Sequence, residues 1–468
     1  MADIGVIDTG FRSAVRKLDR AGRMLHVHDR LDPYLEVAAF VKNHDGDRAL
    51  FFERVGDYAV PVCANLLACH ANILTVFGLD VQGVRAAVER GIHRPLPPRL
   101  VDGGPCQDVV VRDGIDLGTM FPVLHHMPGD AGRFFTASVV IARDPETGTR
   151  NASFHRLQLL GGNETALKLD LGRHLRLLYG KAQRKAEALP IAVVIGGDLS
   201  LAFAAGSMGA HLPLERDELE MASGLRGAPL EVVKCLTVDL EVPAESEIVL
   251  EGELLPDRAV IEGPFLEFTG LYAEAGPSPV FRVHAVTHRR QPIYYTVAGG
   301  EVRLLRKPLM EAGILRSIRN AVPIVQDVEL TPGGLCRFHL VIAVRKERPE
   351  DEGLQRNAIF AAIAALKDLD LITVVDNDID IRDPRAVEWA VAMRFEASRD
   401  LILMPGARGH EYVPASEGGI RTKVGIDATV PFGRLDEVRR VPVPPLPRED
   451  YATSVGPGAE TSHPVFGG

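Results

Sequence analysis

The spacing of apolar positions predicts layered α/β structure at the N-terminal end of the chain. Apolar residues recur with helical periodicity over residues 11–21 and again over residues 33–43. Short apolar runs at residues 49–52 and 59–62 follow these helices and are typical of buried strands. A Pro-rich stretch at residues 95–98 predicts a linker into a second domain.

The middle of the chain has the pattern of a β-domain. From residue 109 to about residue 300, runs rich in β-branched residues alternate with turn residues, which is typical of antiparallel strands. We expect one helix, over residues 165–188, and an apolar run over residues 191–196 to be inserted in this region.

The α/β pattern returns in the last third of the chain. Helices are predicted near residues 309–321 and 355–366, and strands near residues 338–344 and 371–376. After residue 432 the chain becomes Pro-rich and polar, which predicts an irregular tail and makes it a candidate for contact with a partner subunit.

These patterns divide the chain into four parts. We expect an N-terminal α/β domain over residues 1–105, a β-rich domain over residues 106–300, a C-terminal α/β domain over residues 301–432 and a tail over residues 433–468. With 468 residues, of which 46% are hydrophobic, the chain is long enough to bury more than one core. The predicted fold class is therefore a multidomain protein of the α+β or α/β type.

The charge and the cysteines narrow the possible partners and compartment. The formal net charge is −10, so no broad positive field favours nucleic acid or an anionic membrane as partner. The N-terminal segment lacks the apolar region of a secretory signal, and no apolar stretch is long enough to span a bilayer, so we expect a cytoplasmic protein. The five cysteines form no CxxC pair and are expected to be reduced, structural thiols.

Common catalytic signatures are absent from the sequence. It contains no GxGxxG after a strand, no P-loop, no GxSxG nucleophile elbow and no HExxH. The informative stretches are, in chain order, DPETGTRNASFHRLQ, VVIGGD, DELEMASGLRGAPLEVVKC, EGPFLEFTG, VVDNDIDIRDPRAVEWAVAMR and KVGIDATVP. Together and in this order they resemble the UbiD-like family of prenylated-flavin decarboxylases, over about residues 100–430.

The resemblance implies a fold, a reaction and a set of site residues. It implies a central split β-barrel-like domain that binds prenylated FMN, flanked by N- and C-terminal α/β domains, and a carboxy-lyase that acts on an unsaturated or aromatic acid. The positions that match the family's metal ligands are Asn151, His174 and Glu218. Those that match its catalytic triad are Arg156, Glu262 and Glu267. The implied cofactor-binding positions are Asn151, Ser153, Arg156, His174 and Glu218, together with Mn²⁺ or Mg²⁺ and K⁺.

The residue types of the implied metal set suit its chemistry. An amide oxygen, an imidazole and a carboxylate form a mixed O/N set for Mn²⁺ or Mg²⁺, with phosphate oxygens and water completing an octahedron. Such a cation would bridge the protein to a cofactor phosphate, because the chain has no P-loop to do so. From the residues alone the structural interpretations are favoured: Asn151 as a turn residue at a strand end, His174 as an exposed helix residue and Glu218 as a solvated surface charge.

Arg156 stands among apolar neighbours and would need a carboxylate partner if it were buried. Glu262 and Glu267 could supply one, because the Gly-Pro pair between them breaks a strand and lets both carboxylates face one pocket. A surface turn with two solvated acids is the alternative. Asn151 and Arg156 are five residues apart and would face opposite sides of a regular strand, so a bulge or a strand end is expected between them.

The implied reaction needs an electron sink and a proton donor. No side chain accepts the electron pair left when CO2 leaves an sp2 carbon, so a cofactor must accept it. A carboxyl in a dry pocket beside a second acid has a raised pKa, whereas a nearby arginine lowers it. On the resemblance, Glu267 is the candidate proton donor and Glu262 the carboxylate bound to Arg156, and these effects on the pKa are compatible with that division. Because each step is reversible, carboxylation at high bicarbonate is also implied.

The chain departs from the family at two places. Where some members have a phosphate-contacting lysine, this chain has DLIT at residues 370–373, and Lys423 is a weak alternative. Arg303, Arg306 and Lys307 either line a pocket for an anionic substrate or lie on a solvated face, and the solvated face is the favoured interpretation.

Two other functions stay open at this point: an ordinary flavin-binding oxidoreductase, and a cofactor-binding subunit of a larger carboxylase complex. The two glutamates that accompany Arg156 argue against the oxidoreductase, and the presence of all six site residues favours self-sufficient activity over a subunit role. The expected partners are a carboxylic acid substrate, a flavin prenyltransferase as cofactor supplier, and further copies of the chain in a homodimer or higher homo-oligomer. The sequence leaves the identity of the acid and the physiological direction of the reaction open.

Overall fold

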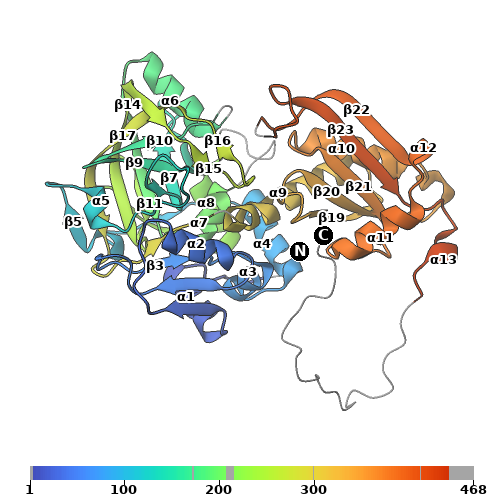
Figure 1. The fold of residues 1–468 in the computed structure, drawn as a ribbon, viewed down its shortest axis with the longest axis horizontal. Coiled ribbons are helices and arrows are strands. Elements are labelled where there is room, and N and C mark those ends of the chain that lie inside the picture. The colour runs from blue at the N-terminus through green and yellow to red at the C-terminus, as the bar shows by residue number, and fades with distance from the viewer. Residues whose placement is uncertain (1–3, 171–172, 207–214, 299, 412, 442–468) are drawn as a thin grey trace, which may run out of the picture.

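The computed structural model describes residues 4–170, 173–206, 215–298, 300–411 and 413–441. Figure 1 shows two lobes: the N-terminal and central parts of the chain form one, and the C-terminal α/β part forms the other. The long helix α9 (Gly300–Ala321) lies between them. Most of the predicted tail, from residue 442 onward, lies outside the described residues.

A small mixed sheet begins the first lobe. Its strands, in spatial order, are β1 (Met24–Val27), β2 (Ala49–Phe52), β3 (Val62–Ala64) and β18 (Tyr294–Tyr295). The accompanying helices are α1 (Phe11–Arg20), α2 (Glu36–Asn43), α3 (His70–Phe77) and α4 (Val81–His93). In α1 the buried residues Phe11, Ala14 and Leu18 recur at the three- and four-residue spacing of one helix face. Because β18 comes from the end of the central segment and pairs with β3, one hydrophobic core runs through both parts.

The central part is a nine-stranded sheet that curls into a half-barrel, as expected for a split β-barrel-like domain. Its path is β6 (Phe134–Phe135), β9 (Leu157–Gly161), β10 (Glu164–Leu167), β17 (Gly276–His288), β14 (Ile248–Glu262), β11 (Leu189–Ile195), β7 (Ser138–Arg143) and β8 (Arg150–Phe154), with β5 (Val109–Val111) paired to β17. Every pairing in it is antiparallel.

Shorter elements surround this sheet. The helices are α5 (Leu117–Met120), α6 (His174–Arg184), α7 (Leu199–Ala205) and α8 (Glu218–Arg226), with the 3₁₀ turn η1 (Pro105–Gln107). The small sheets are β4 (Arg99–Leu100) with β12 (Glu231–Lys234) and β13 (Glu241–Pro243), and β15 (Phe265–Leu266) with β16 (Tyr272–Ala273).

The predicted helix over residues 165–188 is wrong in its first part. Residues 164–167 form β10, which is hydrogen-bonded between β9 and β17, and α6 begins only at His174. Thr165 is β-branched and fully buried, so pairing with two strands outweighs the helical pattern of the segment.

The C-terminal lobe is a five-stranded sheet with a parallel centre. Its order is β19 (Val325–Leu330), β20 (His339–Val344), β21 (Leu371–Asp376), β23 (Ile420–Ala428) and β22 (Leu401–Arg408). The helices are α10 (Leu354–Ala365), α11 (Pro384–Arg394), α12 (Ala397–Asp400) and α13 (Leu435–Val438), with the turn η2 (Pro349–Asp351). The strand predicted over residues 371–376 coincides with β21, since a run buried on both faces is continuously apolar.

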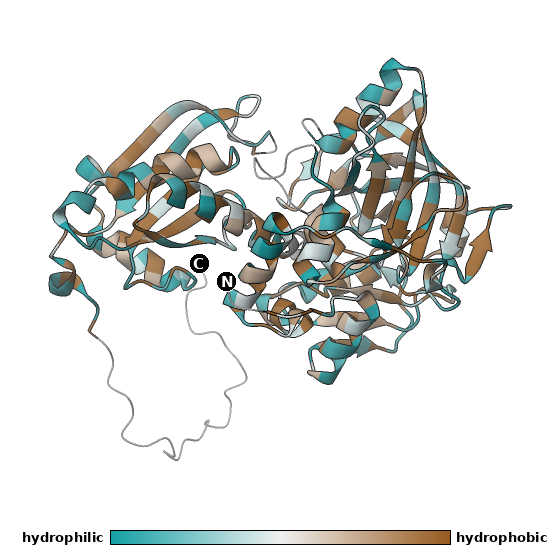
Figure 2. Ribbon diagram, turned by 180° about the vertical axis from the view of Figure 1, so that it is seen from behind, coloured by the Kyte–Doolittle hydropathy of each residue, from teal (hydrophilic) through white to brown (hydrophobic). Residues whose placement is uncertain are grey.

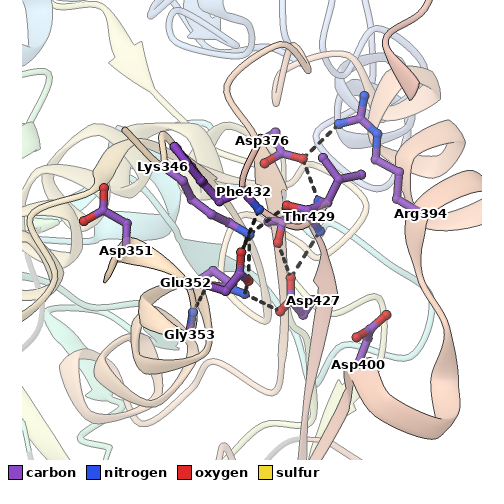
Figure 3. A network of polar contacts seen from close by, with 12 residues as sticks. Lys346, Asp351, Glu352, Gly353, Asp376, Arg394, Asp400, Asp427, Thr429 and Phe432 are labelled. Atoms are coloured by element: carbon purple, nitrogen blue, oxygen red, sulfur yellow. Dashed lines mark hydrogen bonds and ion pairs between the residues drawn. The ribbon is translucent and has the colours of Figure 1, made fainter. Parts of the chain in front are cut away.

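A buried polar network lies at the carboxyl ends of these parallel strands (Figure 3). Asp376, at the end of β21, accepts hydrogen bonds from Arg394 at 3.1 Å and from the backbone of Val430 at 3.0 Å. Asp427, near the end of β23, accepts from Gln355 and from Thr429. Burial raises the pKa of Asp376 to about 6. These hydrogen bonds connect the ends of β21 and β23 to neighbouring segments, and the buried charged groups thereby have partners.

The expectation of a solvated face for Arg303, Arg306 and Lys307 is wrong. Lys307 is 1% exposed and forms an ion pair with the buried carboxylate of Glu329. The Nε atom of Arg306 is also buried, and Arg303 forms a half-buried ion pair with Asp45. These side chains are covered because α9 packs against α4 in one lobe and against α10 and β19 in the other. No helix in the described ranges is long and apolar enough to cross a membrane.

The register shift in the longest strand pair requires a glycine. The pairing of β14 with β17 slips between Glu251 and Gly252, and a Cβ added at Gly252 would lie 1.9 Å from the carbonyl oxygen of Arg282. We therefore expect Gly252→Ala to lower the free energy of unfolding by about 1–3 kcal/mol through overpacking.

The matched control is Gly180→Ala inside α6, where the new Cβ would meet nothing closer than 3.8 Å. This change should leave stability unaltered or raise it by up to about 1 kcal/mol through helix propensity. Denaturant unfolding of both variants tests the pair, and equal stabilities would contradict the close backbone approach at Gly252.

Candidate active site

Arg156 joins two glutamates that come from separate turns of the chain. Its Nε donates to Glu262 Oε1 at 2.7 Å and its Nη2 donates to Glu262 Oε2 at 3.1 Å, which is a bidentate ion pair. Its Nη1 donates to Oε1 of Glu267. The alternative of two solvated acids on a surface turn is therefore wrong, because Glu262 is fully buried and both acids bind one guanidinium.

The local backbone explains how the three side chains meet. β8 ends at Phe154 and β9 begins at Leu157, so Arg156 lies in the break between two strands. The strand end expected between Asn151 and Arg156 is thus present. Glu262 ends β14, and the chain then turns at Gly263, whose φ of 85° suits glycine.

Neighbouring side chains support this turn. The backbone N–H of Gly263 donates to the side-chain oxygen of Gln158 at 2.9 Å. The backbone N–H of Leu266 donates to Asp130 at 2.9 Å, just before Glu267. The ring of Phe265 lies 4.9 Å from the guanidinium carbon of Arg156. The turn is therefore anchored to the central sheet and the guanidinium is screened by an aromatic ring.

The two glutamates have different surroundings. The side chain of Glu262 is 0% exposed, and Lys168 lies 3.7 Å from its second oxygen. Glu267 keeps 22% of its side chain exposed and makes a single contact with Arg156. Burial raises the pKa of Glu267 and the Arg156 guanidinium opposes this only in part. Glu267 is thus the acid better suited to hold a proton that it can exchange.

A second polar cluster forms at the N-terminus of α8. Glu218, the first residue of α8, accepts hydrogen bonds from the backbone N–H of Ala152 at 2.8 Å and from the side-chain amide of Asn151 at 3.1 Å. Asn151 Oδ1 accepts a hydrogen bond from Ser153 at 3.2 Å. Burial raises the pKa of Glu218 to about 8. Three of the predicted cofactor-binding residues therefore lie in one hydrogen-bonded cluster.

The donor set of this cluster suits a divalent cation in part. A cation between Asn151 and Glu218 would face the amide oxygen after a rotation of the Asn151 amide, which exchanges Oδ1 and Nδ2. His174 is half-buried at the start of α6, and within the described ranges its side chain makes no hydrogen bond to Asn151 or Glu218. No group of three or more His, Cys, Asp or Glu residues that could hold a metal occurs among the described residues.

The sequence did not predict several residues that support the site. Lys168, Gln158 and Asp130 reach the site from separate segments, and no spacing in the sequence signals their approach. His155 lies within the NASFHR stretch. Its two ring nitrogens are hydrogen-bonded to the Ser153 hydroxyl and to the backbone oxygen of Lys168. Its burial lowers its pKa to about 4, so it acts as a neutral hydrogen-bonding group.

Lys423, considered above as a phosphate contact, and the cysteines have structural roles. Lys423 is buried and donates to the backbone oxygens of Lys367 and Leu369, so its ammonium is used within the C-terminal lobe. The five cysteines are free thiols, as expected, and burial raises the pKa of Cys106 to about 12. A thiol with so high a pKa is not a nucleophile at neutral pH.

Comparison with known proteins identifies the family. Profiles of 3-octaprenyl-4-hydroxybenzoate carboxy-lyase match in three consecutive parts: its N-terminal domain over residues 15–90, its Rift-related domain over residues 99–302 and its C-terminal domain over residues 303–428. The chain belongs to the UbiD family of carboxy-lyases. The resemblance drawn from the motif stretches is thus confirmed, and so is the expected class of enzyme.

Three relatives illustrate the match. The anhydromevalonate phosphate decarboxylase of Methanothermobacter thermautotrophicus is 35% identical over 91% of this chain and 98% of its own. The UbiD-class enzyme HmfF from Pelotomaculum thermopropionicum, solved in complex with FMN, has 42% identity and a TM-score of 0.89, covering 93% of this chain and 97% of that one. An evolved dimeric form of HmfF in complex with prFMN has 40% identity and a TM-score of 0.86, with the same coverage.

The Arg156 ion pairs predict a large stability effect in this UbiD protein. Replacing Arg156 by Ala leaves the fully buried Glu262 without its bidentate partner, so the free energy of unfolding should fall by about 3–5 kcal/mol. Arg258→Ala, which removes a half-exposed partner of Glu164 in the same sheet, should cost less than about 1 kcal/mol. Denaturant unfolding compares them, and equal losses would contradict the burial of the Arg156 pair.

Proposed function

We propose that this UbiD-family chain is a reversible, non-oxidative decarboxylase of an aromatic, heteroaromatic or α,β-unsaturated carboxylic acid that uses prenylated FMN. The observation that carries the proposal is the guanidinium of Arg156 between the buried carboxylate of Glu262 and the partly exposed carboxyl of Glu267. This arrangement provides one fixed charge pair and one acid whose pKa is raised by burial.

The cofactor supplies the electron sink that no side chain provides. In our proposal Asn151, Ser153 and Glu218 would hold Mn²⁺ or Mg²⁺, which would neutralise the charge of the cofactor phosphate, with K⁺ as a second cation. His174 completes the metal set from α6. The contact between Asn151 and Glu218 supports this assignment, because an amide and a carboxylate already converge there. Two related solved structures hold FMN and prFMN, which supports a flavin in this fold.

The remaining steps belong to the chain's own residues. Arg156 orients the substrate carboxylate before the bond between that carboxylate and the adjacent carbon breaks and CO2 leaves. Glu267 then delivers a proton to the vacated carbon, and the electron pair returns to form the new C–H bond. Glu262 holds Arg156 in place through both of its oxygens. Read in reverse, the same steps carboxylate the product.

The substrate is a small carboxylic acid in our proposal. One relative is named for an anhydromevalonate phosphate, and the family profile for an octaprenyl-hydroxybenzoate, so the family name alone covers different acids. A flavin prenyltransferase would supply the cofactor. We further propose a homo-oligomer, at least a dimer; a dimeric form of a related enzyme supports it.

Glu267→Gln should abolish turnover while the cofactor stays bound, because the amide keeps the shape of the carboxyl but has no proton to transfer. In the unaltered enzyme, kcat should fall as pH rises through the pKa of Glu267, which lies above the usual carboxyl range. Product formed in D2O should carry deuterium at the vacated carbon. A near-normal rate for the Gln variant would remove Glu267 from the reaction.

Loss of a metal ligand should lower flavin content and not only the rate. We expect Glu218→Ala and His174→Ala to lose Mn²⁺ and flavin together, since the cation bridges protein and phosphate. Elemental analysis and flavin absorbance measure the two losses. Glu411→Ala, at an exposed ion pair of the C-terminal lobe, is the control that should retain both. Metal loss with full flavin occupancy would contradict the bridge.

The proposed reaction depends on the prenylated form of the flavin. Protein produced without a flavin prenyltransferase should be folded but inactive, because unmodified flavin handles hydride and single-electron transfer. Addition of prenylated FMN with Mn²⁺ and K⁺ under anaerobic conditions should restore CO2 release from a panel of aromatic and unsaturated acids. If protein shown by mass spectrometry to hold only unmodified flavin releases CO2 equally fast, the proposed function is wrong.

A further inference from the structure

The loop that carries Glu267 also touches the C-terminal lobe. Glu267 and its neighbour Phe268 follow β15 in the central domain, which spans residues 99–302. The ring of Phe268 lies against residues of the C-terminal domain, which spans residues 303–428. The two glutamates that bind Arg156 therefore differ in their support, since Glu262 ends a strand in the middle of the central sheet.

An aromatic cluster makes this contact between the lobes. The rings of Phe268 and Phe338 are nearly parallel, with centroids 6.2 Å apart. The ring of His410 stands nearly perpendicular to both, at 6.3 Å from Phe268 and 5.7 Å from Phe338. The guanidinium carbon of Arg337 lies 5.2 Å from the centre of the Phe268 ring. We call these four residues the aromatic clasp.

The C-terminal side of the clasp is firmly held. Buried Arg337 donates two hydrogen bonds to Asp368, at 2.9 Å and 2.7 Å, so its guanidinium has a fixed place above the Phe268 ring. Burial, with Arg337 adding to it, lowers the pKa of His410 to about 4. At neutral pH the imidazole is therefore uncharged and packs as an aromatic ring.

Phe268 is coupled directly to the carboxyl of Glu267. A peptide bond joins the two residues, and the backbone of Phe268 lies near enough to the Glu267 carboxyl to lower its pKa against the effect of burial. The loop is a tight turn, in which Glu267 N–H donates to Leu271 and Gly270 N–H donates back to Glu267, at 2.9 Å and 3.0 Å. A displacement of the Phe268 ring would thus move the acid relative to Arg156.

We propose that the aromatic clasp is the device by which the C-terminal domain positions Glu267 for proton transfer. The proposal rests on the proposed function, in which Glu267 is the proton donor. The clasp residues are positioning residues, and they act through Phe268. Asp130 holds the turn from the central domain, and the clasp holds it from the C-terminal domain. The Glu267 carboxyl therefore keeps its position beside Arg156 only when both contacts are present.

The test uses the full chain loaded with prenylated FMN and compares Phe338→Ala with Phe338→Tyr. The Ala variant removes the stacked ring, whereas the Tyr variant keeps it. Phe360→Ala is the matched control, because Phe360 is an exposed aromatic residue on α10 outside the clasp. Phe338→Leu replaces the Ala variant if the latter fails to fold.

We expect kcat of the Ala variant to fall by roughly tenfold to hundredfold, with flavin content, KM and melting temperature close to those of the parent. Hydrogen–deuterium exchange should rise in peptides that cover residues 265–271 and stay unchanged elsewhere in the central domain. The Tyr variant and the Phe360 control should keep the parent's rate and exchange.

Two results would overturn the proposal. Unchanged exchange at residues 265–271 would show that the clasp does not order the loop, and faster exchange with an unchanged kcat would show that proton transfer does not depend on it. Failure of the proposed function looks different. In that case Glu267→Gln itself retains full turnover, and the clasp loses its catalytic role even where the exchange data show that it orders the loop.

Discussion

A buried guanidinium has to be neutralised, and the surroundings of Arg156 follow from this constraint. Leaving one partner of a buried ion pair unpaired costs several times more than a surface pair contributes. Arg156 meets the requirement with Glu262, whose two oxygens match the guanidinium fork, and with Glu267 as a second acid. Placing three charged groups together requires a strand break at Arg156 and a turn at Gly263.

The same constraint separates the roles of the two acids. Glu262 is buried at the end of a central strand and bound on both oxygens, so it is suited to hold Arg156 in place. Glu267 has one contact with Arg156, a pKa raised by burial and partial access to solvent. An acid that must release and regain a proton needs these properties. The asymmetry between the acids therefore fits proton transfer better than hydride transfer in an ordinary flavin oxidoreductase.

The two lobes contribute to the candidate site in different ways. The central domain carries both glutamates, Arg156 and the cluster around Glu218, so the proposed chemistry lies on one sheet and at its edges. Within the described residues the C-terminal lobe supplies no group to the Arg156 ion pairs, yet its rings contact Phe268, the residue next to Glu267. The network around Asp376 and Asp427 lies at the carboxyl ends of the parallel strands, at the other end of the sheet from Phe338 (Figure 3). In Figure 2 the strands of both lobes carry hydrophobic stretches, as expected of one core in the first lobe and two separate clusters in the C-terminal lobe.

The sequence by itself determined the class of fold, the family and the residue types of the site. Apolar periodicity is local, so it predicted α1, α10 and β21 closely, and six motif stretches in one order were enough for the family. The tertiary structure alone decided which charges meet. Residues 164–167 form a strand because they pair with β9 and β17. Lys307 is buried because α9 packs between the two lobes. It also brought Phe268 against Phe338, seventy positions along the chain. Such contacts depend on how segments far apart in the sequence pack against one another. The spacing of residues along the chain does not show which of these segments will meet.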